Sequence, residues 1–64
     1  IVEDHCHVST GAILNGKVSL GRGSFIGSGS VVKEKLKIGN NCVVSANVFL
    51  RKNLSPGTTH KKQR

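Results

Sequence analysis

The chain has 64 residues, and its ten lysines and arginines against three acidic residues give a formal net charge of +7 at pH 7. A chain of this length holds one domain at most and normally needs partners or cross-links to bury enough apolar surface for stability. It contains no signal-peptide pattern and no apolar run near the ~20 residues of a membrane span, so we expect a cytoplasmic protein without a membrane partner.

A six-residue repeat starts with the first residues and continues through most of the chain. Each unit begins with an aliphatic residue, namely Val2, Val8, Leu14, Leu20, Ile26, Val32, Ile38, Val44 and Leu50. The fifth position is small or aliphatic in every unit: Cys6, Ala12, Val18, Ser24, Ser30, Leu36, Cys42, Val48 and Leu54. This period predicts a repeat architecture. Because the repeat is already in register at Ile1, without a Met, we expect the chain to be part of a longer protein whose preceding coil is missing.

The units predict short strands joined by turns, because Gly, Asn and Ser separate the aliphatic residues and no stretch keeps the apolar stripe of a helix. The larger fifth-position residues Val18, Leu36 and Leu54 recur every eighteen residues, which indicates three units per coil. We therefore predict an all-β fold, a parallel β-helix of three coils with three hexapeptides each. The predicted coils are 2–19, 20–37 and 38–55.

The two cysteines fall in one fifth-position column with Ser24 between them. Stacked strands are ~4.8 Å apart, so Cys6 and Cys42 would be separated by roughly 10 Å, beyond the ~7 Å that a disulfide can bridge. We interpret both as small core residues.

The basic residues suggest a solvated face rather than a nucleic-acid site. Lys33, Lys35 and Lys37 alternate along one unit, and on a strand this spacing turns all three outward while the residues between them take the other face. A basic balance also suits nucleic acid or a phosphate-bearing ligand. Only Phe25 and Phe49 are able to stack on bases, so we predict no nucleic-acid partner.

The residue before each lead position is expected to point outward, and it differs between the three sides of the coil. The columns are His7, Phe25 and Val43; Ile13, Val31 and Phe49; and Ser19, Lys37 and Ser55. Exposed apolar stripes such as the first two usually mark a partner surface. We therefore predict a homotrimer in which each subunit gives two different sides to its neighbours around a closed ring.

The repeat ends at residues 55–58, whose sequence SPGT is a turn signal. The six residues that follow include no apolar one. We predict a partial β-helix domain over 1–58 and a short, disordered basic tail over 59–64.

Two segments carry a family resemblance: HVSTGAILNGKVSLGRGSFIGSGSVV, which begins at His7, and IGNNCVVSANVFLRKNLSPGT, which begins at Ile38. They resemble the left-handed parallel β-helix of hexapeptide-repeat acyltransferases. Because of HVSTGA and the Gly16 that follows, the chain looks most like the sialic-acid O-acetyltransferases and UDP-amino-sugar N-acetyltransferases. The resemblance implies a left-handed helix and transfer of acetyl from acetyl-CoA to an amine or hydroxyl of a nucleotide-linked sugar.

The resemblance also implies three residues that bind acetyl-CoA: His7, Ser28 and Ala46. His7 matches a histidine whose N–H bonds the thioester carbonyl, and the other two match backbone contacts, Ala46 standing where the family often has glycine. The family's base histidine would lie nine residues before His7 and so precede Ile1. The resemblance therefore implies no catalytic residue within this chain, and we do not expect the chain alone to be active.

Two other functions stay open at this point. A non-catalytic β-helical scaffold or trimerisation module fits a chain that lacks the base. The zinc-dependent enzymes built on the same helix use three histidines, and the pair His5 and His7, only two residues apart, does not reproduce that ligand spacing. We therefore predict no metal site.

Overall fold

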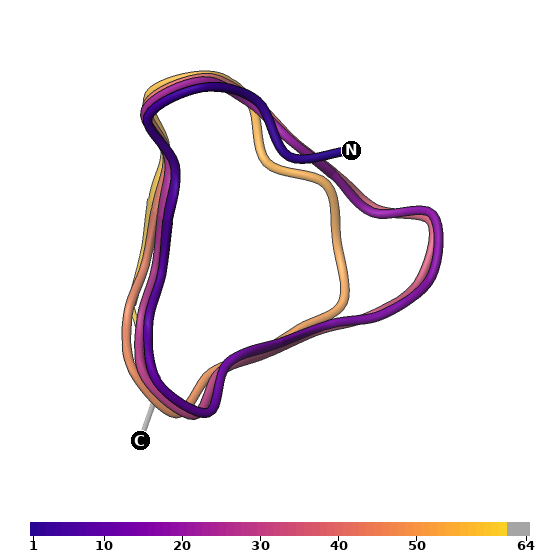
Figure 1. Cartoon of the computed structure of the whole chain (residues 1–64), viewed down its shortest axis with the longest axis vertical. Helices are drawn as coiled ribbons and strands as arrows, with labels where there is room; N and C mark the ends of the chain where they lie inside the picture. The colour runs from indigo at the N-terminus through magenta and orange to yellow at the C-terminus, as the bar shows by residue number, and fades with distance from the viewer. Residues whose placement is uncertain (62–64) are drawn as a thin grey trace.

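The structure is a computed structural model that describes residues 1–61, in which every strand has two residues. The strands are β1 (His7–Val8), β2 (Ile13–Leu14), β3 (Ser19–Leu20), β4 (Phe25–Ile26), β5 (Val31–Val32), β6 (Lys37–Ile38), β7 (Val43–Val44), β8 (Phe49–Leu50) and β9 (Thr59–His60). Seen along the tube, successive coils lie almost on top of one another as triangles with three sides and three corners (Figure 1). None of the described residues forms a helix long and apolar enough to cross a membrane.

Each side of the triangle is a parallel sheet whose strands come from successive coils. The first side is β1-β4-β7-β9, the second side is β2-β5-β8 and the third side is β3-β6. In the first two coils each residue pairs with the one eighteen positions later, as His7 does with Phe25 and Ile13 with Val31. This confirms the predicted left-handed parallel β-helix of three coils.

The lead residues fill the interior, as the repeat predicted. Leu20, Ile26, Val32, Val44 and Leu50 are fully buried. A two-residue strand turns one side chain inward and its predecessor outward, which is why the preceding residue in each strand is exposed or only half-buried. The outward apolar columns are therefore on the first and second sides, as expected.

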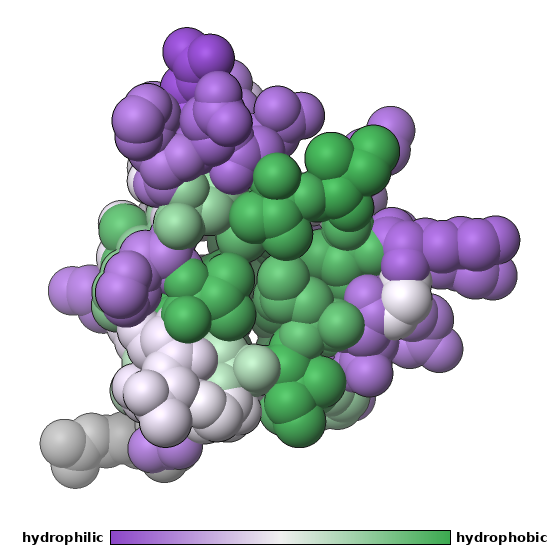
Figure 2. Space-filling model, viewed as in Figure 1, coloured by the Kyte–Doolittle hydropathy of each residue, from purple (hydrophilic) through white to green (hydrophobic). Residues whose placement is uncertain are grey.

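The end of the tube that faces the viewer in Figure 2 exposes part of this interior. The lead residues Val2 and Val8 of the first coil are 53% and 40% exposed, whereas their equivalents Leu20 and Ile26 in the next coil are fully buried. A lead residue is enclosed only when coils lie on both sides of it. Hydrophobic residues therefore occupy the middle of this end, while strongly hydrophilic residues lie at the upper and right-hand corners and residues of intermediate hydropathy at the lower left (Figure 2).

Buried hydroxyls and thiols bond the backbone of the next coil. The Ser24 Oγ donates to the Gly39 carbonyl at 2.8 Å and accepts from the Cys42 N–H at 3.1 Å. Both cysteines are free, and their thiols donate to carbonyl oxygens, as in the 3.0 Å contact of Cys6 with Gly21. These bonds satisfy polar groups that burial would otherwise leave unpaired.

The corners are tight turns with a common backbone. The first corner comprises residues 3–5, 21–23, 39–41 and 56–57, the second corner 9–11, 27–29 and 45–47, and the third corner 15–17 and 33–35. Each turn places a residue in the left-handed region: His5, Gly11, Lys17, Gly23, Gly29, Lys35, Asn41, Asn47 and Gly57.

The third coil is shorter than predicted. Leu54 bridges Ile38, so it takes a lead position instead of stacking in the column of Leu36, and the coil advances by sixteen residues rather than eighteen. The chain cuts across the third corner here, inside the path that the earlier coils follow (Figure 1). The Asn53 Oδ1 accepts from the Lys37 N–H at 2.8 Å, which holds the shortened segment against the coil before it.

The helix also continues past its predicted boundary at residue 58. Thr59 and His60 pair with Val43 and Val44, so β9 extends the first side, and half-buried His60 occupies a lead position. The predicted tail was therefore wrong at these two positions, and its last residues, 62–64, lie outside the described part of the chain.

The prediction of a lysine-bearing strand at 33–37 was wrong as well. Lys33 follows β5, Lys35 sits at the third corner and Lys37 begins β6, so the three are exposed around a turn instead of along one face. Glu34, expected on the inner face, is exposed too. Strand alternation does not apply because the residues between β5 and β6 form a turn.

Candidate functional site

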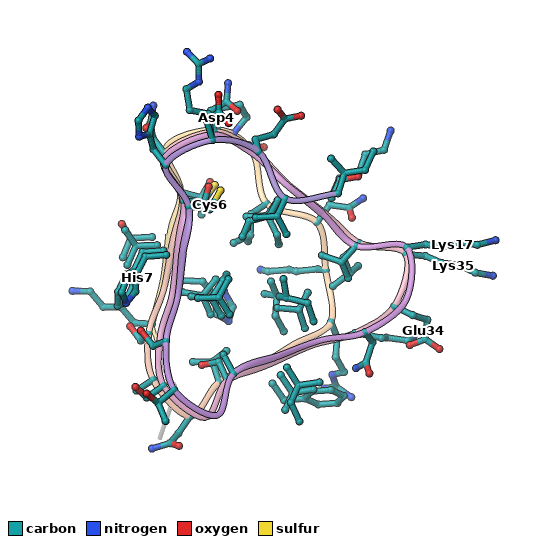
Figure 3. The ribbon with its side chains drawn as sticks, viewed as in Figure 1. Asp4, Cys6, His7, Lys17, Glu34 and Lys35 are labelled. Carbon is teal, nitrogen blue, oxygen red and sulfur yellow. The ribbon has the colours of Figure 1, made fainter. Side chains whose placement is uncertain are left out.

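The first candidate residue, His7, lies on the outer surface of the first side. It belongs to β1, is exposed, and points away from the tube in Figure 3. Its imidazole stacks on the Phe25 ring of β4, with ring centroids 5.3 Å apart and an angle of 8° between the planes. Stacking fixes the plane of the imidazole and leaves its edge, which carries the N–H, toward solvent.

The other two candidates, Ser28 and Ala46, occupy equivalent places at the second corner in successive coils. Both are exposed, and the Ser28 carbonyl accepts from the Asn47 N–H at 2.9 Å. Within residues 1–61, neither the Ser28 nor the Ala46 amide donates to another group of the protein. Both N–H groups are therefore free to meet a ligand.

Backbone geometry explains how alanine replaces glycine at position 46. The positive φ of these turns belongs to Gly29 (72°) and Asn47 (58°), one residue later. Ala46 therefore lies in an ordinary region of φ, and its side chain introduces no strain. The Ser30 N–H bonds the Gly27 carbonyl at 3.2 Å, which with the φ of Gly29 makes a type II turn with Ser28 in its second position.

The three candidates define a strip that runs from the first side to the second corner. His7 belongs to the first coil, Ser28 to the second and Ala46 to the third. Phe25 lies beside His7 and is three residues before Ser28. Three extended residues span roughly 10 Å, so the His7 and Ser28 ends of the strip are about that far apart. A long flexible ligand is able to touch all three, whereas a small one is not.

A basic depression lies beyond the strip, at the end of the third coil. Its lining residues are Asn47, Val48, Phe49, Arg51, Lys52, His60 and Lys61, and its volume is about 470 Å³. The Arg51 guanidinium stands over the Phe49 ring, 5.8 Å from the centroid. Cations around an aromatic ring suit a phosphate-bearing or heteroaromatic group.

Sequence reasoning missed this depression because it placed His60 in a disordered tail. One signal was available: Phe49 and Arg51 are two residues apart at an outward position, so both side chains emerge on the same side of the chain. The contribution of β9 had no such signal.

His5 has a different place from His7. It is an exposed turn residue of the first corner with a φ of 61°. Among residues 1–61 no group of three His, Cys, Asp or Glu side chains is arranged to hold a metal ion.

Comparison with known proteins relates this geometry to one family. The family model described as bacterial transferase hexapeptide (six repeats) matches residues 17–52, more than half of the chain. No curated protein sequence matches significantly. A solved structure, the acetyltransferase domain of PglB from Neisseria gonorrhoeae FA1090 in complex with acetyl coenzyme A, is 26% identical with a TM-score of 0.86. The match covers 89% of this chain but only 28% of the PglB chain. The chain therefore belongs to the bacterial hexapeptide transferase family.

Proposed function

We propose that this chain is the acetyl-CoA-binding part of an acetyltransferase. The observation that carries the proposal is the strip on which an exposed histidine and two backbone amides lie in successive coils, neither amide having an acceptor within residues 1–61. The similar PglB domain was solved with acetyl coenzyme A, which is a ligand of the required length and flexibility.

The acetyl group would lie at His7. An imidazole N–H directed at the thioester carbonyl stabilises the negative charge that develops on its oxygen when a nucleophile attacks. Stacking on Phe25 orders the ring before the ligand binds, so less side-chain freedom is lost when this bond forms.

The remainder of acetyl-CoA would follow the strip toward the third coil. Its pantetheine arm carries amide carbonyls, which are acceptors for the free N–H groups of Ser28 and Ala46. Its phosphates would then reach the basic depression, where Arg51, Lys52 and Lys61 provide positive charge.

We further propose a nucleotide-linked sugar as the acceptor and a homotrimer as the assembly. No base is assigned within this chain, and the position implied by the family resemblance precedes Ile1. Phe25, Val43, Ile13 and Phe49 are between 37% and 59% exposed on the first and second sides. Subunit contacts would cover these side chains. We therefore expect Phe49→Asp to be monomeric, and sedimentation of this variant tests the proposed homotrimer.

The test of ligand binding compares acetyl-CoA with CoA by calorimetry. His7→Ala should weaken acetyl-CoA about five- to tenfold, the value of one hydrogen bond, and leave CoA unchanged because CoA lacks the thioester carbonyl. Equal effects on both ligands would contradict the assigned role of His7.

Ser28→Pro tests the backbone contact separately. Pro56 occupies the same place in the last turn of the first corner, where the Thr58 N–H bonds the Ser55 carbonyl at 3.2 Å, so proline fits this type II position. Ser28→Pro should weaken both ligands about tenfold because it removes one N–H, whereas Ser28→Ala should not. If the wild-type chain forms trimers but binds neither ligand, it is a scaffold instead.

A further inference from the structure

The third corner and the first residue of β6 carry a cluster of cations that the proposed acetyl-CoA site does not use. We call Lys17, Lys33, Lys35 and Lys37 the basic corner; all four are exposed. The single acid among residues 15–19 and 33–37 is Glu34. The other two acidic residues of the chain lie at the first corner, and the second corner has no charged residue. Positive charge is thus concentrated in the basic corner, whereas the first corner has one cation, Arg22, against two acids.

Backbone preference does not explain two of these lysines. Lys17 and Lys35 hold the left-handed turn position, with φ of 62° and 66°. The equivalent positions of the other two corners are all glycine or asparagine apart from His5, and these residues adopt this conformation most easily. A long cationic side chain is therefore present here at a conformational cost.

Electrostatics within the chain does not explain them either. Lys17 and Lys35 are equivalent residues in adjacent coils, roughly 4.8 Å apart along the tube, and their side chains point the same way in Figure 3. Like charges so placed repel one another, and one acid cannot balance four cations. An external anion would remove this repulsion.

The shape of the basic corner favours a flat partner over a polymer. In Figure 1 the first two coils bulge outward at this corner, while the shortened third coil does not reach it. A projecting ridge does not enclose a nucleic-acid strand as a groove would. The turns at 15–17 and 33–35 contain no aromatic or aliphatic residue, so they lack the stacking surface that single-stranded nucleic acids use.

We infer that the basic corner binds the surface of an anionic phospholipid membrane through its headgroups. Each lysine near an anionic surface strengthens binding by about a factor of five, and this attraction acts through charge without a spanning segment or an inserted apolar side chain. The expectation of no membrane partner rested on the lack of a span and does not apply to peripheral contact. The inference is independent of acetyl-CoA binding, because the basic corner contains none of the residues assigned to that site.

The test uses vesicles of phosphatidylcholine with about 30% phosphatidylserine, and pure phosphatidylcholine vesicles for comparison. Co-sedimentation should show binding of the wild-type chain to the anionic vesicles alone. Lys17→Asn with Lys35→Asn should reduce that binding roughly ten- to thirtyfold, since each cation near the surface contributes about a factor of five. Asparagine suits the left-handed position, so this variant keeps the fold, and circular dichroism checks that it does.

The matched control is Arg22→Gln with Lys61→Gln, which removes two charges outside the basic corner. Binding that persists in the control but is lost in the asparagine variant supports the inference. Equal loss in both would show that only net charge matters and would overturn it. Absence of wild-type binding would overturn it too, as would tighter binding to duplex DNA with the same dependence on Lys17 and Lys35, which would make nucleic acid the partner.

Discussion

The second and third corners both place one residue of each turn in the left-handed region, but they present different parts of the chain to the solvent. At the second corner the Ser28 and Ala46 amides donate to no other group within residues 1–61, and the coils are in close contact: a Cβ added to Gly27 would lie 2.5 Å from the Ala46 nitrogen. At the third corner the place equivalent to Gly27 holds Asn15 and Lys33, which already carry a Cβ. Gly16, one position later in that turn, has no described heavy atom within 4 Å of an added Cβ. The repeat therefore sets the backbone, and the residues chosen at a corner decide whether amides or side chains reach a ligand.

The largest effect is expected from a substitution that disrupts the close contact between coils at the second corner. Gly27→Val should lower the free energy of unfolding by about 3 kcal/mol or more, because backbone atoms of the next coil cannot move away from the new side chain. Urea denaturation measures the change. The control at the third corner is Gly16→Ala, which meets open space and should change stability by less than about 1 kcal/mol. Similar losses in the two variants would show that the close approach of Gly27 to the Ala46 nitrogen does not restrict side-chain size.

A smaller effect is expected from the buried hydroxyl that closes the second corner. The Ser30 Oγ accepts from the Val48 N–H at 3.0 Å and donates to the Ser45 carbonyl. Ser30→Ala leaves both groups without this partner and should cost about 2 kcal/mol in the same denaturation experiment. Ser28→Ala, at an exposed position of the same corner, should be nearly neutral. A neutral Ser30→Ala would mean that water replaces the hydroxyl.

The fold was predictable because its main determinant repeats: a lead residue such as Ile26 is inward in every coil, and its predecessor Phe25 is outward. The shortened third coil was not predictable in this way. Leu54 is aliphatic and suits either the lead or the fifth position, so hydrophobic pattern alone cannot locate it. His60 was missed for the opposite reason, since a polar residue in a lead position carries no hydrophobic signal.

The candidate site was predictable only in part. The positions of His7, Ser28 and Ala46 came from a family resemblance. The structure adds what the pattern could not contain: the stacking partner of the histidine, and the lack of an acceptor for the two amides within residues 1–61. The basic depression includes His60 of β9. This strand pairs with β7 only because the third coil is two residues shorter than the repeat predicts, so the sequence pattern did not indicate the depression. Contacts between coils depend on the length of each turn, and a two-residue change in one turn moves every later residue.

The smallest effect is expected from exchanging the left-handed residues of the turns at the second and third corners. Lys35→Asn at the third corner should raise the free energy of unfolding by up to about 1 kcal/mol, because asparagine tolerates the φ of 66° better than lysine does. Asn47→Lys at the second corner, where φ is 58°, should lower it by a similar amount for the same reason. Opposite signs would show that the backbone of both corners prefers asparagine and that lysine is kept at the third corner for its charge. If Lys35→Asn is destabilising instead, the lysine contributes to the fold itself, and the conformational argument for an external anion at the basic corner fails.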